Sequence, residues 1–337
     1  MQLRHFIGTK GRILLTSIMC TAFVAACGSI SGTTPSSTTV TTQADSSGAS
    51  TTTTVPAQYK VGNFADGVAE ELLAPSSSPP GSNIWSCVPT SAHPYPVVLV
   101  HGTFANSAFS WQALSPMLAN QGYCVFALNY GQTIPGPIYG TGEISASAQT
   151  LSTFVNKVLA STGASKVDII GHSQGGMMPR YYIQNLGGAS KVNMMIGIAA
   201  SNEGTTADGI GTLAGDLTKL IGISFSDLGC TACDEQEVGS TFVTNLDSQS
   251  GGGTSPGVKY VNIESKYDEV ITPYKNAFLP AASNVQNLTL QDYCSTDFTE
   301  HIGIIYDPVT LALIVNALGP DSSTYKPPCS IVLPVIS

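Results

Sequence analysis

Gly171-His172-Ser173-Gln174-Gly175-Gly176 lies between two segments of different character. Residues 166–170 form an apolar, β-branched run that predicts a buried strand of a parallel sheet, and residues 177–182 predict the opening of a helix. A sharp turn from strand to helix exposes the hydroxyl of Ser173 at the corner, and small glycines let the two elements approach closely. The hexapeptide therefore predicts a nucleophilic serine. The alternative is a tight Gly/Ser turn without chemistry.

A histidine that follows the serine is the expected general base. The chain has five histidines, at positions 5, 93, 101, 172 and 301, and only His301 lies beyond Ser173. In hydrolases with a serine on such a turn, the chain order is nucleophile, acid, base. His301 is therefore the predicted base. We expect His101 and His172, which do not follow Ser173, to have structural roles.

The acid that orients the base is expected after a late strand. Residues 259–263 alternate in a β-rich pattern, and the chain then turns through Asp268 and Glu269. A buried carboxylate here orients the imidazole of His301 and stabilises its protonated form. We assign this role to Asp268, with Glu269 and then Asp292 as alternatives. Aspartates also cap turns, which is the structural alternative for Asp268.

Two backbone N–H groups are expected to stabilise an oxyanion. The N–H of Gln174 opens the helix after the nucleophile, where the helix dipole favours negative charge. A second apolar strand, residues 96–100, ends in His101-Gly102-Thr103-Phe104. A His-Gly turn after an early strand is where such hydrolases place the other donor. We assign it to Thr103, with Phe104 as the alternative.

The composition restricts the partners of the chain. Only 10% of its 337 residues are charged, and the formal net charge is −9. Nucleic-acid binding depends on basic side chains, so we expect no nucleic-acid partner; a neutral, apolar substrate is compatible with this charge. Cys230 and Cys233 have the spacing of a metal or redox pair, but no second pair and no nearby histidine supports a metal site. We expect no metal, no cofactor and a monomer.

The N-terminal residues predict export. Arg4, Lys10 and Arg12 precede an apolar stretch within residues 1–26, which is typical of a signal peptide. The end of this stretch resembles a bacterial lipobox, so we expect Cys27 to be lipidated and to anchor the chain in a membrane. Ordinary cleavage that leaves an incidental cysteine is the alternative. The protein is thus expected to be a cell-envelope lipoprotein or secreted.

Residues 27–84 are predicted to be a Ser/Thr-rich tether and linker. Between residues 28 and 56 the chain has no aromatic side chain and cannot bury a core. The short apolar segment 64–73 is either a small helix packed on the following domain or disordered.

Six cysteines remain after Cys27, and an even number in an exported chain suggests three disulfides. Cys87 lies just before one expected strand and Cys124 begins another, and the starts of neighbouring strands lie at the same edge of a parallel sheet. Cys230 and Cys233 are close enough to form a local loop. The expected pairs are Cys87–Cys124, Cys230–Cys233 and Cys294–Cys329.

Residues 85–337 are predicted to form one α/β domain. Strand-like runs alternate with helical patterns, which predicts a mostly parallel central sheet with helices on both faces. Expected strands cover 96–100, 124–128, 166–170, 192–200, 259–263 and 285–290, and expected helices cover 108–120 and 146–160. Catalytic groups then gather at the carboxyl ends of the strands. Residues 201–256, rich in Gly, Ser and Thr, are expected to be an irregular cap or lid over the substrate entrance.

The chain resembles the bacterial class 2 lipases, particularly their secreted actinobacterial-type members, over most of residues 81–329. The matching segments are WSC at 85–87, HP at 93–94, VVLVHGT at 97–103, GYCVFALNYG at 122–131, GHSQGGMMPRYY at 171–182, YDEVITP at 267–273 and EH at 300–301. The resemblance implies an α/β-hydrolase fold, a Ser173–Asp268–His301 triad, donors at Thr103 and Gln174, and hydrolysis of carboxylic esters, often of acylglycerols, without a cofactor. One departure is Glu203, where relatives often have histidine.

The sequence thus predicts an exported carboxylic-ester hydrolase that acts on acylglycerols or other lipid esters through an acyl-enzyme intermediate. One alternative is an envelope acyltransferase that uses the same triad. The other is a non-catalytic binding module tethered to the cell surface.

Overall fold

The computed structural model describes residues 58–133, 136–222, 229–320, 322 and 324–335, and two short strands nearer the N-terminus. These strands, β1 (Thr38–Val40) and β2 (Thr53–Val55), pair with each other in antiparallel register. The expected signal peptide (1–26), the expected lipidation site Cys27 and residues 28–37, 41–52, 56 and 57 of the expected tether lie outside the described residues.

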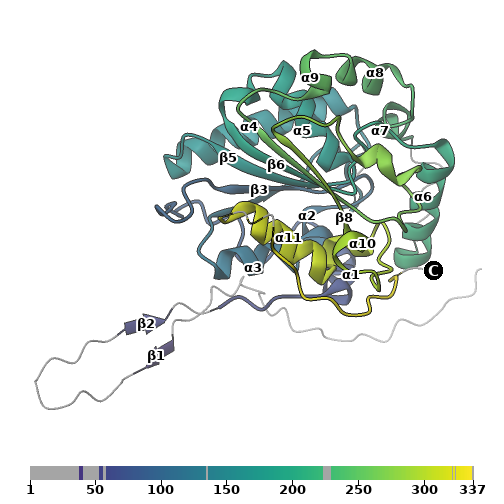
Figure 1. Cartoon of the computed structure of the whole chain (residues 1–337). Coiled ribbons are helices and arrows are strands. Elements are labelled where there is room, and N and C mark those ends of the chain that lie inside the picture. The colour runs from purple at the N-terminus through teal and green to yellow at the C-terminus, as the bar shows by residue number, and fades with distance from the viewer. Residues whose placement is uncertain are drawn as a thin grey trace, which may run out of the picture.

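A parallel sheet forms the centre of the described body (Figure 1). Six strands pair in the order β4-β3-β5-β6-β7-β8, and every pairing between them is parallel. Their bounds are β3 (Val97–Val100), β4 (Val125–Leu128), β5 (Val167–His172), β6 (Val192–Ile198), β7 (Lys259–Glu264) and β8 (Val285–Thr289). These strands confirm the six expected from the sequence. Their β-branched, apolar runs favour extended strands that are buried on both faces of a sheet.

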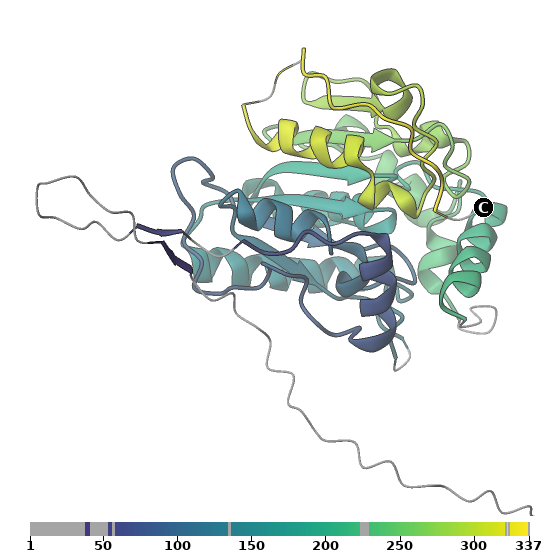
Figure 2. The same cartoon turned by 90° about the horizontal axis from the view of Figure 1, so that it is seen from below.

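Helices cover both faces of this sheet, and alternate strand residues point to opposite layers. Val98 and Val100 of β3 belong to one apolar cluster with α4 (Ile144–Thr162) and α5 (Gln174–Asn185). Val97 and Leu99 belong to a second cluster with α3 (Leu114–Asn120) and α11 (Pro308–Leu318). Figure 2 looks onto this second face, where α3 and α11 lie across the strands. The predicted α/β architecture with helices on both faces is confirmed.

The strand order places a site at one end of the sheet. The chain runs from β3 outward to the edge strand β4, and then crosses β3 to form β5 on its other side. In open α/β sheets, ligands bind beyond the carboxyl ends of strands where the order reverses in this way. The loops after β3 and β5 carry Thr103 and Ser173.

Residues 58–84 pack on the folded body, although the sequence assigned them to a linker. Within them, α1 (Phe64–Leu73) begins at an Asn63 capping box. The ring of Phe64 packs edge-on against Phe109 and Tyr306, with centroids 6.0 and 5.8 Å apart. Further along, the Asn83 side chain donates to the carbonyl of Ala127 at 2.9 Å. The folded unit therefore begins before residue 85, and residues 64–73 form the packed helix rather than a disordered segment.

The cap is helical where the sequence predicted an irregular segment. It contains α6 (Ala207–Ile221), α7 (Thr231–Glu235), α8 (Thr241–Asp247) and α9 (Ser250–Gly253). Thr206 caps α6 by accepting the N–H of Gly209, and Leu213 and Leu217 bury its apolar face. Capping and burial offset the low helix propensity of its glycines. The expected helix at 108–120 is also divided, into α2 (Ser107–Ser110) and α3.

Three disulfides join Cys87 to Cys124, Cys230 to Cys233 and Cys294 to Cys329, which are the pairs expected from the sequence. The third connects the loop after β8 and α10 (Leu290–Tyr293) to the C-terminal segment. In the described part of the chain, no helix has the length and apolar composition needed to cross a membrane. Within the same residues, no group of three or more His, Cys, Asp or Glu side chains is arranged to hold a metal ion.

Candidate active site

Ser173 occupies a sharp turn between β5 and α5. Its backbone angles are φ 55° and ψ −123°, and residues other than glycine rarely adopt a positive φ of this kind. A Cβ atom at Gly171 would lie 1.8 Å from the carbonyl oxygen of Gly175, and one at Gly175 would lie 2.3 Å from that of Val100. The glycines of the hexapeptide are therefore required by the close approach of backbone, which holds the strained serine in place.

His301 and Asp268 form a buried pair after the last strands. The Nδ1 of His301 lies 2.7 Å from Oδ2 of Asp268, and both side chains are fully buried. The other carboxylate oxygen, Oδ1, accepts the backbone N–H groups of Val270 and Ile271 at 2.8 and 2.7 Å. These two bonds fix the carboxylate plane, so Oδ2 is held toward the imidazole.

The two alternative acids make other contacts. Glu269 contacts the backbone of His301: its Oε2 lies 3.5 Å from the backbone nitrogen. Asp292 forms an exposed ion pair with Lys266 at 3.1 Å. Of the three candidates, Asp268 is the one that contacts the imidazole of His301.

The other ring nitrogen of His301, Nε2, is buried and has no hydrogen-bond partner among the described residues. His172, adjacent to Ser173, places this ring near the serine. Its ring centroid lies 4.8 Å from that of His301, and its Nε2 lies 2.9 Å from the carbonyl oxygen of His301. The imidazole of His301 thus packs against the residue next to the strained serine, and the structure shows no hydrogen bond between Ser173 Oγ and Nε2 of His301.

Carboxylates around His301 set its protonation. Burial alone lowers the pKa of His301, but the charge and hydrogen bond of Asp268, with the charges of Glu269 and Glu300, raise that pKa above the ordinary 6.5. Burial raises the pKa of Glu269 to about 7 although the charge of His301 opposes the shift. Burial and the neighbouring Asp268 raise the pKa of Glu264 well above 4.5. The surroundings therefore favour a protonated imidazole.

Thr103 and Gln174, the two residues predicted to supply the oxyanion donors, contact each other. A Cβ atom at Gly102 would lie 3.0 Å from Cβ of Ser173, so the loop after β3 directly contacts the serine. The side chain of Gln174 donates to Oγ1 of Thr103 at 3.0 Å. At the first position of the 12-residue α5, the backbone N–H of Gln174 has no intrahelical acceptor. Phe104, the alternative to Thr103, has a positive φ of 63°.

His101 has the structural role expected from the sequence. Its Nδ1 lies 2.8 Å from the carbonyl oxygen of Gly102, and its ring stacks on Tyr130 with centroids 4.3 Å apart. Burial lowers the pKa of His101 to about 4, so the ring is neutral at ordinary pH. It supports the loop that carries Thr103.

Sequence reasoning missed two residues that connect the cap to the rest of the domain. Gln236, beyond the disulfide Cys230–Cys233, donates to Oγ1 of Thr103 at 2.8 Å. The buried Arg180 of α5 holds the cap through Asp247 at 2.7 Å and the carbonyl oxygen of Asn202 at 2.8 Å. No sequence pattern points to Gln236. Arg180 lies in segment 171–182, which resembles the class 2 lipases, but no role was assigned to this arginine from the sequence. Glu203, the departure from that family, is exposed.

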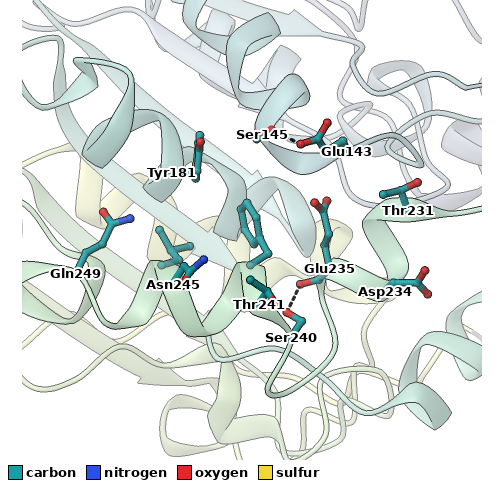
Figure 3. A pocket seen from close by; sticks show the side chains of 12 residues that line it. Glu143, Ser145, Tyr181, Thr231, Asp234, Glu235, Ser240, Thr241, Asn245 and Gln249 are labelled. Carbon is teal, nitrogen blue, oxygen red and sulfur yellow. Dashed lines mark hydrogen bonds between the residues drawn. The ribbon is translucent and has the colours of Figure 1, made fainter.

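The serine and histidine are closed off from solvent. Ser173 is 2% exposed and His301 is 0% exposed. A pocket of about 480 Å³ lies nearby between α4, α5, α7 and α8, where Figure 3 shows Glu143, Tyr181, Glu235 and Asn245 around it. Ser173, Asp268 and His301 do not line this pocket. It therefore lies between the cap and the helices α4 and α5, and the buried serine does not line it.

The parallel sheet, the strained serine and the paired histidine and aspartate define the α/β-hydrolase class. Residues 94–311 match the family Lipase (class 2). Because this match covers well over half of the chain, the protein belongs to that family, and the resemblance seen in the sequence is confirmed.

Parts of this chain are similar to known proteins. A triacylglycerol lipase of Pseudarthrobacter phenanthrenivorans is 43% identical over 94 residues, which is 26% of this chain and 27% of that protein. Among solved structures, Aspergillus fumigatus lipase B has a TM-score of 0.55 at 22% identity, over 74% of this chain and 56% of that one. Bacillus licheniformis lipase BlEst2, in its mature form, has a TM-score of 0.51 at 18% identity, over 68% and 94%. Both structures support the α/β-hydrolase fold.

Proposed function

We propose that the protein is an exported serine hydrolase that cleaves carboxylic esters of lipids. The observation that carries the proposal is the buried Asp268–His301 pair, whose imidazole packs against His172, the residue before the strained Ser173, and has an unpaired Nε2 among the described residues. Membership of the lipase family and the triacylglycerol lipase relative support the same reaction.

The mechanism begins with a neutral His301, whose Nε2 can accept a proton. Oγ of Ser173 attacks the ester carbonyl carbon while Nε2 of His301 accepts the hydroxyl proton, and the backbone N–H groups of Thr103 and Gln174 stabilise the resulting oxyanion. Nε2 then gives its proton to the departing alcohol, which leaves an acyl group on Ser173. Water attacks this acyl-enzyme with His301 again as base, and the carboxylic acid departs. Asp268 fixes the tautomer of His301 and stabilises its protonated form.

The covering of the site favours apolar esters. Phe104, Leu213, Leu217 and Ile302 belong to one buried apolar cluster that includes α6 of the cap. An ester can reach the 2%-exposed Ser173 only when covering residues move, and apolar chains gain most from the surface that this movement exposes. We therefore assign acylglycerols or similar lipid esters as substrates.

Export is part of the proposal. Three disulfides are typical of proteins that fold in an oxidising compartment. With the signal peptide expected at residues 1–26, they support secretion or attachment of the protein to the envelope through a lipidated Cys27.

Covalent labelling tests the reaction. A fluorophosphonate should label the parent protein at Ser173 and abolish its hydrolysis of p-nitrophenyl esters. The Ser173→Ala variant should fold, bind no label and lose at least about 10³-fold in kcat. Retained turnover in this variant contradicts the assignment. Hydrolysis measured with and without an added alcohol acceptor separates hydrolysis from acyl transfer.

A further inference from the structure

The hydroxyl of Thr103 receives two hydrogen bonds inside the protein. Nε2 of Gln174 donates to Oγ1 at 3.0 Å, and Nε2 of Gln236 donates to the same atom at 2.8 Å. Thr103 is 2% exposed, so solvent does not compete for these contacts. One donor comes from the helix after the nucleophile and the other from the cap.

Neither amide can be turned around. Nε2 of Gln174 also donates to the carbonyl oxygen of Gly140 at 2.9 Å, and Nε2 of Gln236 donates to that of Ala232 at 2.9 Å. A carbonyl oxygen only accepts, so each nitrogen must be the NH₂ group of its amide. In addition, Oε1 of Gln236 accepts the hydroxyl of Ser201 at 3.0 Å. Thr103 is therefore the acceptor in both contacts.

These contacts leave the hydroxyl with a single remaining role. A threonine oxygen has two lone pairs and one hydrogen, and here both lone pairs are occupied by N–H donors. Among the described residues, no acceptor receives the hydrogen. Gly102, the residue before Thr103, approaches Ser173, the nucleophile of the proposed reaction, so closely that a Cβ atom at Gly102 would lie 3.0 Å from Cβ of Ser173. The hydroxyl is thus restricted to donating.

We infer that Gln236 is a positioning residue which, with Gln174, holds the Thr103 hydroxyl as a donor to the oxyanion. The inference rests on the proposed ester hydrolysis and adds a cap residue to its machinery. Gln236 is itself firmly held, because its backbone carbonyl accepts the N–H of Thr205 at 2.9 Å. The preceding Glu235 accepts the N–H that opens α4, at Ile144, at 2.7 Å.

A double-mutant cycle tests this coupling. Gln236→Leu should lower kcat for a p-nitrophenyl ester about tenfold and leave KM nearly unchanged, because the donor acts on the transition state. Thr103→Val should lower kcat about 100-fold. In the Thr103→Val background, Gln236→Leu should add less than about a further twofold, since its target is gone. In the Thr103→Ser background, which keeps the hydroxyl, the tenfold effect should return.

Gln112→Leu is the matched control. Gln112 is also a buried glutamine whose amide donates to a backbone carbonyl, that of Ala108 at 2.8 Å, but it lies outside the site. The control should keep the parent kcat. An equal loss from Gln236→Leu in the Thr103 and Thr103→Val backgrounds, or a change confined to KM, overturns the inference. Failure of the parent protein to hydrolyse esters instead refutes the proposed function.

Gln236→Glu is the second variant, because it conserves the shape of the side chain. An ionised carboxylate only accepts, so it draws the Thr103 hydroxyl away from the oxyanion; a protonated carboxyl again donates. The ratio of variant to parent kcat should therefore rise as the pH falls. A ratio that does not change with pH contradicts the inference. This test remains available if Gln236→Leu does not fold.

Discussion

His172 holds the backbone of His301 through a hydrogen bond from Nε2 to the carbonyl oxygen, with the two atoms 2.9 Å apart. Because a carbonyl oxygen only accepts, Nε2 of His172 carries the hydrogen. Burial, followed by the charge of His301, lowers the pKa of His172 well below 6.5, so the ring stays neutral when His301 is protonated. The residue before the nucleophile therefore fixes the position of the base.

His172→Phe removes this hydrogen bond and keeps a planar aromatic ring at the position. The buried carbonyl of His301 loses its donor, so we expect a loss of about 1–3 kcal/mol in the free energy of unfolding, with a lower kcat at similar KM. Urea denaturation and steady-state kinetics measure both quantities. His93→Phe is the control, since His93 stacks on Tyr123 with centroids 3.8 Å apart, away from the site. Parent-like kcat in His172→Phe contradicts the prediction.

Asp268→Asn should reverse the tautomer of His301. Val270 and Ile271 donate to Oδ1, so they hold the amide oxygen there and leave the NH₂ group facing Nδ1 of His301. Nδ1 must then accept, and the hydrogen moves to Nε2, which can no longer take the proton of Ser173. We expect kcat to fall about 10³–10⁴-fold with folding intact. Asp292→Asn, at an exposed ion pair, should keep parent activity; a small loss in Asp268→Asn refutes this orientation.

The pH profile should report the carboxylates around His301. Hydrolysis needs the neutral imidazole, so kcat/KM should fall as the pH drops through a pKa above 6.5. Glu269→Gln removes a negative charge that stabilises the protonated ring, so this acid limb should move to lower pH. Profiles of kcat/KM for the two proteins measure the shift. A limb that stays in place, or moves to higher pH, shows that Glu269 does not act on His301.

Much of the fold follows from local sequence patterns. The strands are β-branched runs that are apolar on both faces, and this pattern leads directly to a covered parallel sheet. The disulfide between Cys87 and Cys124 was predictable because parallel strands begin at the same edge. The serine turn was predictable because the approach of Gly171 to Gly175 tolerates no side chain.

Features that depend on distant contacts were not predictable. α1 packs because Phe64 meets Phe109 and Tyr306, and nothing near residue 64 indicates this. α6 is rich in glycine, so local propensity opposes a helix that burial of Leu213 and Leu217 stabilises. Order along the chain pointed to His301, because no other histidine follows Ser173. It gave no indication of Gln236, whose contact with Thr103 exists only once the cap is folded.

Glu71→Gln should stabilise the protein at alkaline pH. Glu71 of α1 is 2% exposed, and neither of its oxygens has a hydrogen-bond partner among the described residues, although the nearby Asn106 partly favours the charged form. Burial raises the pKa of Glu71 from 4.5 to about 8. In the folded state the proton is therefore held more tightly than in the unfolded state.

The sign of the pH effect follows from this difference. Below pH 4.5 the carboxyl is protonated in both states, so its ionisation does not change the free energy of unfolding. As the pH rises toward 8, the carboxyl ionises in the unfolded state only, and the free energy of unfolding falls. By pH 9 the loss from Glu71 should be on the order of 4 kcal/mol, and Glu71→Gln should remove most of it. Denaturation at pH 5 and pH 9 measures this, with Glu70→Gln on the same helix as control. If parent and Glu71→Gln lose equal stability between these pH values, then Glu71 is ionised at no cost in the fold.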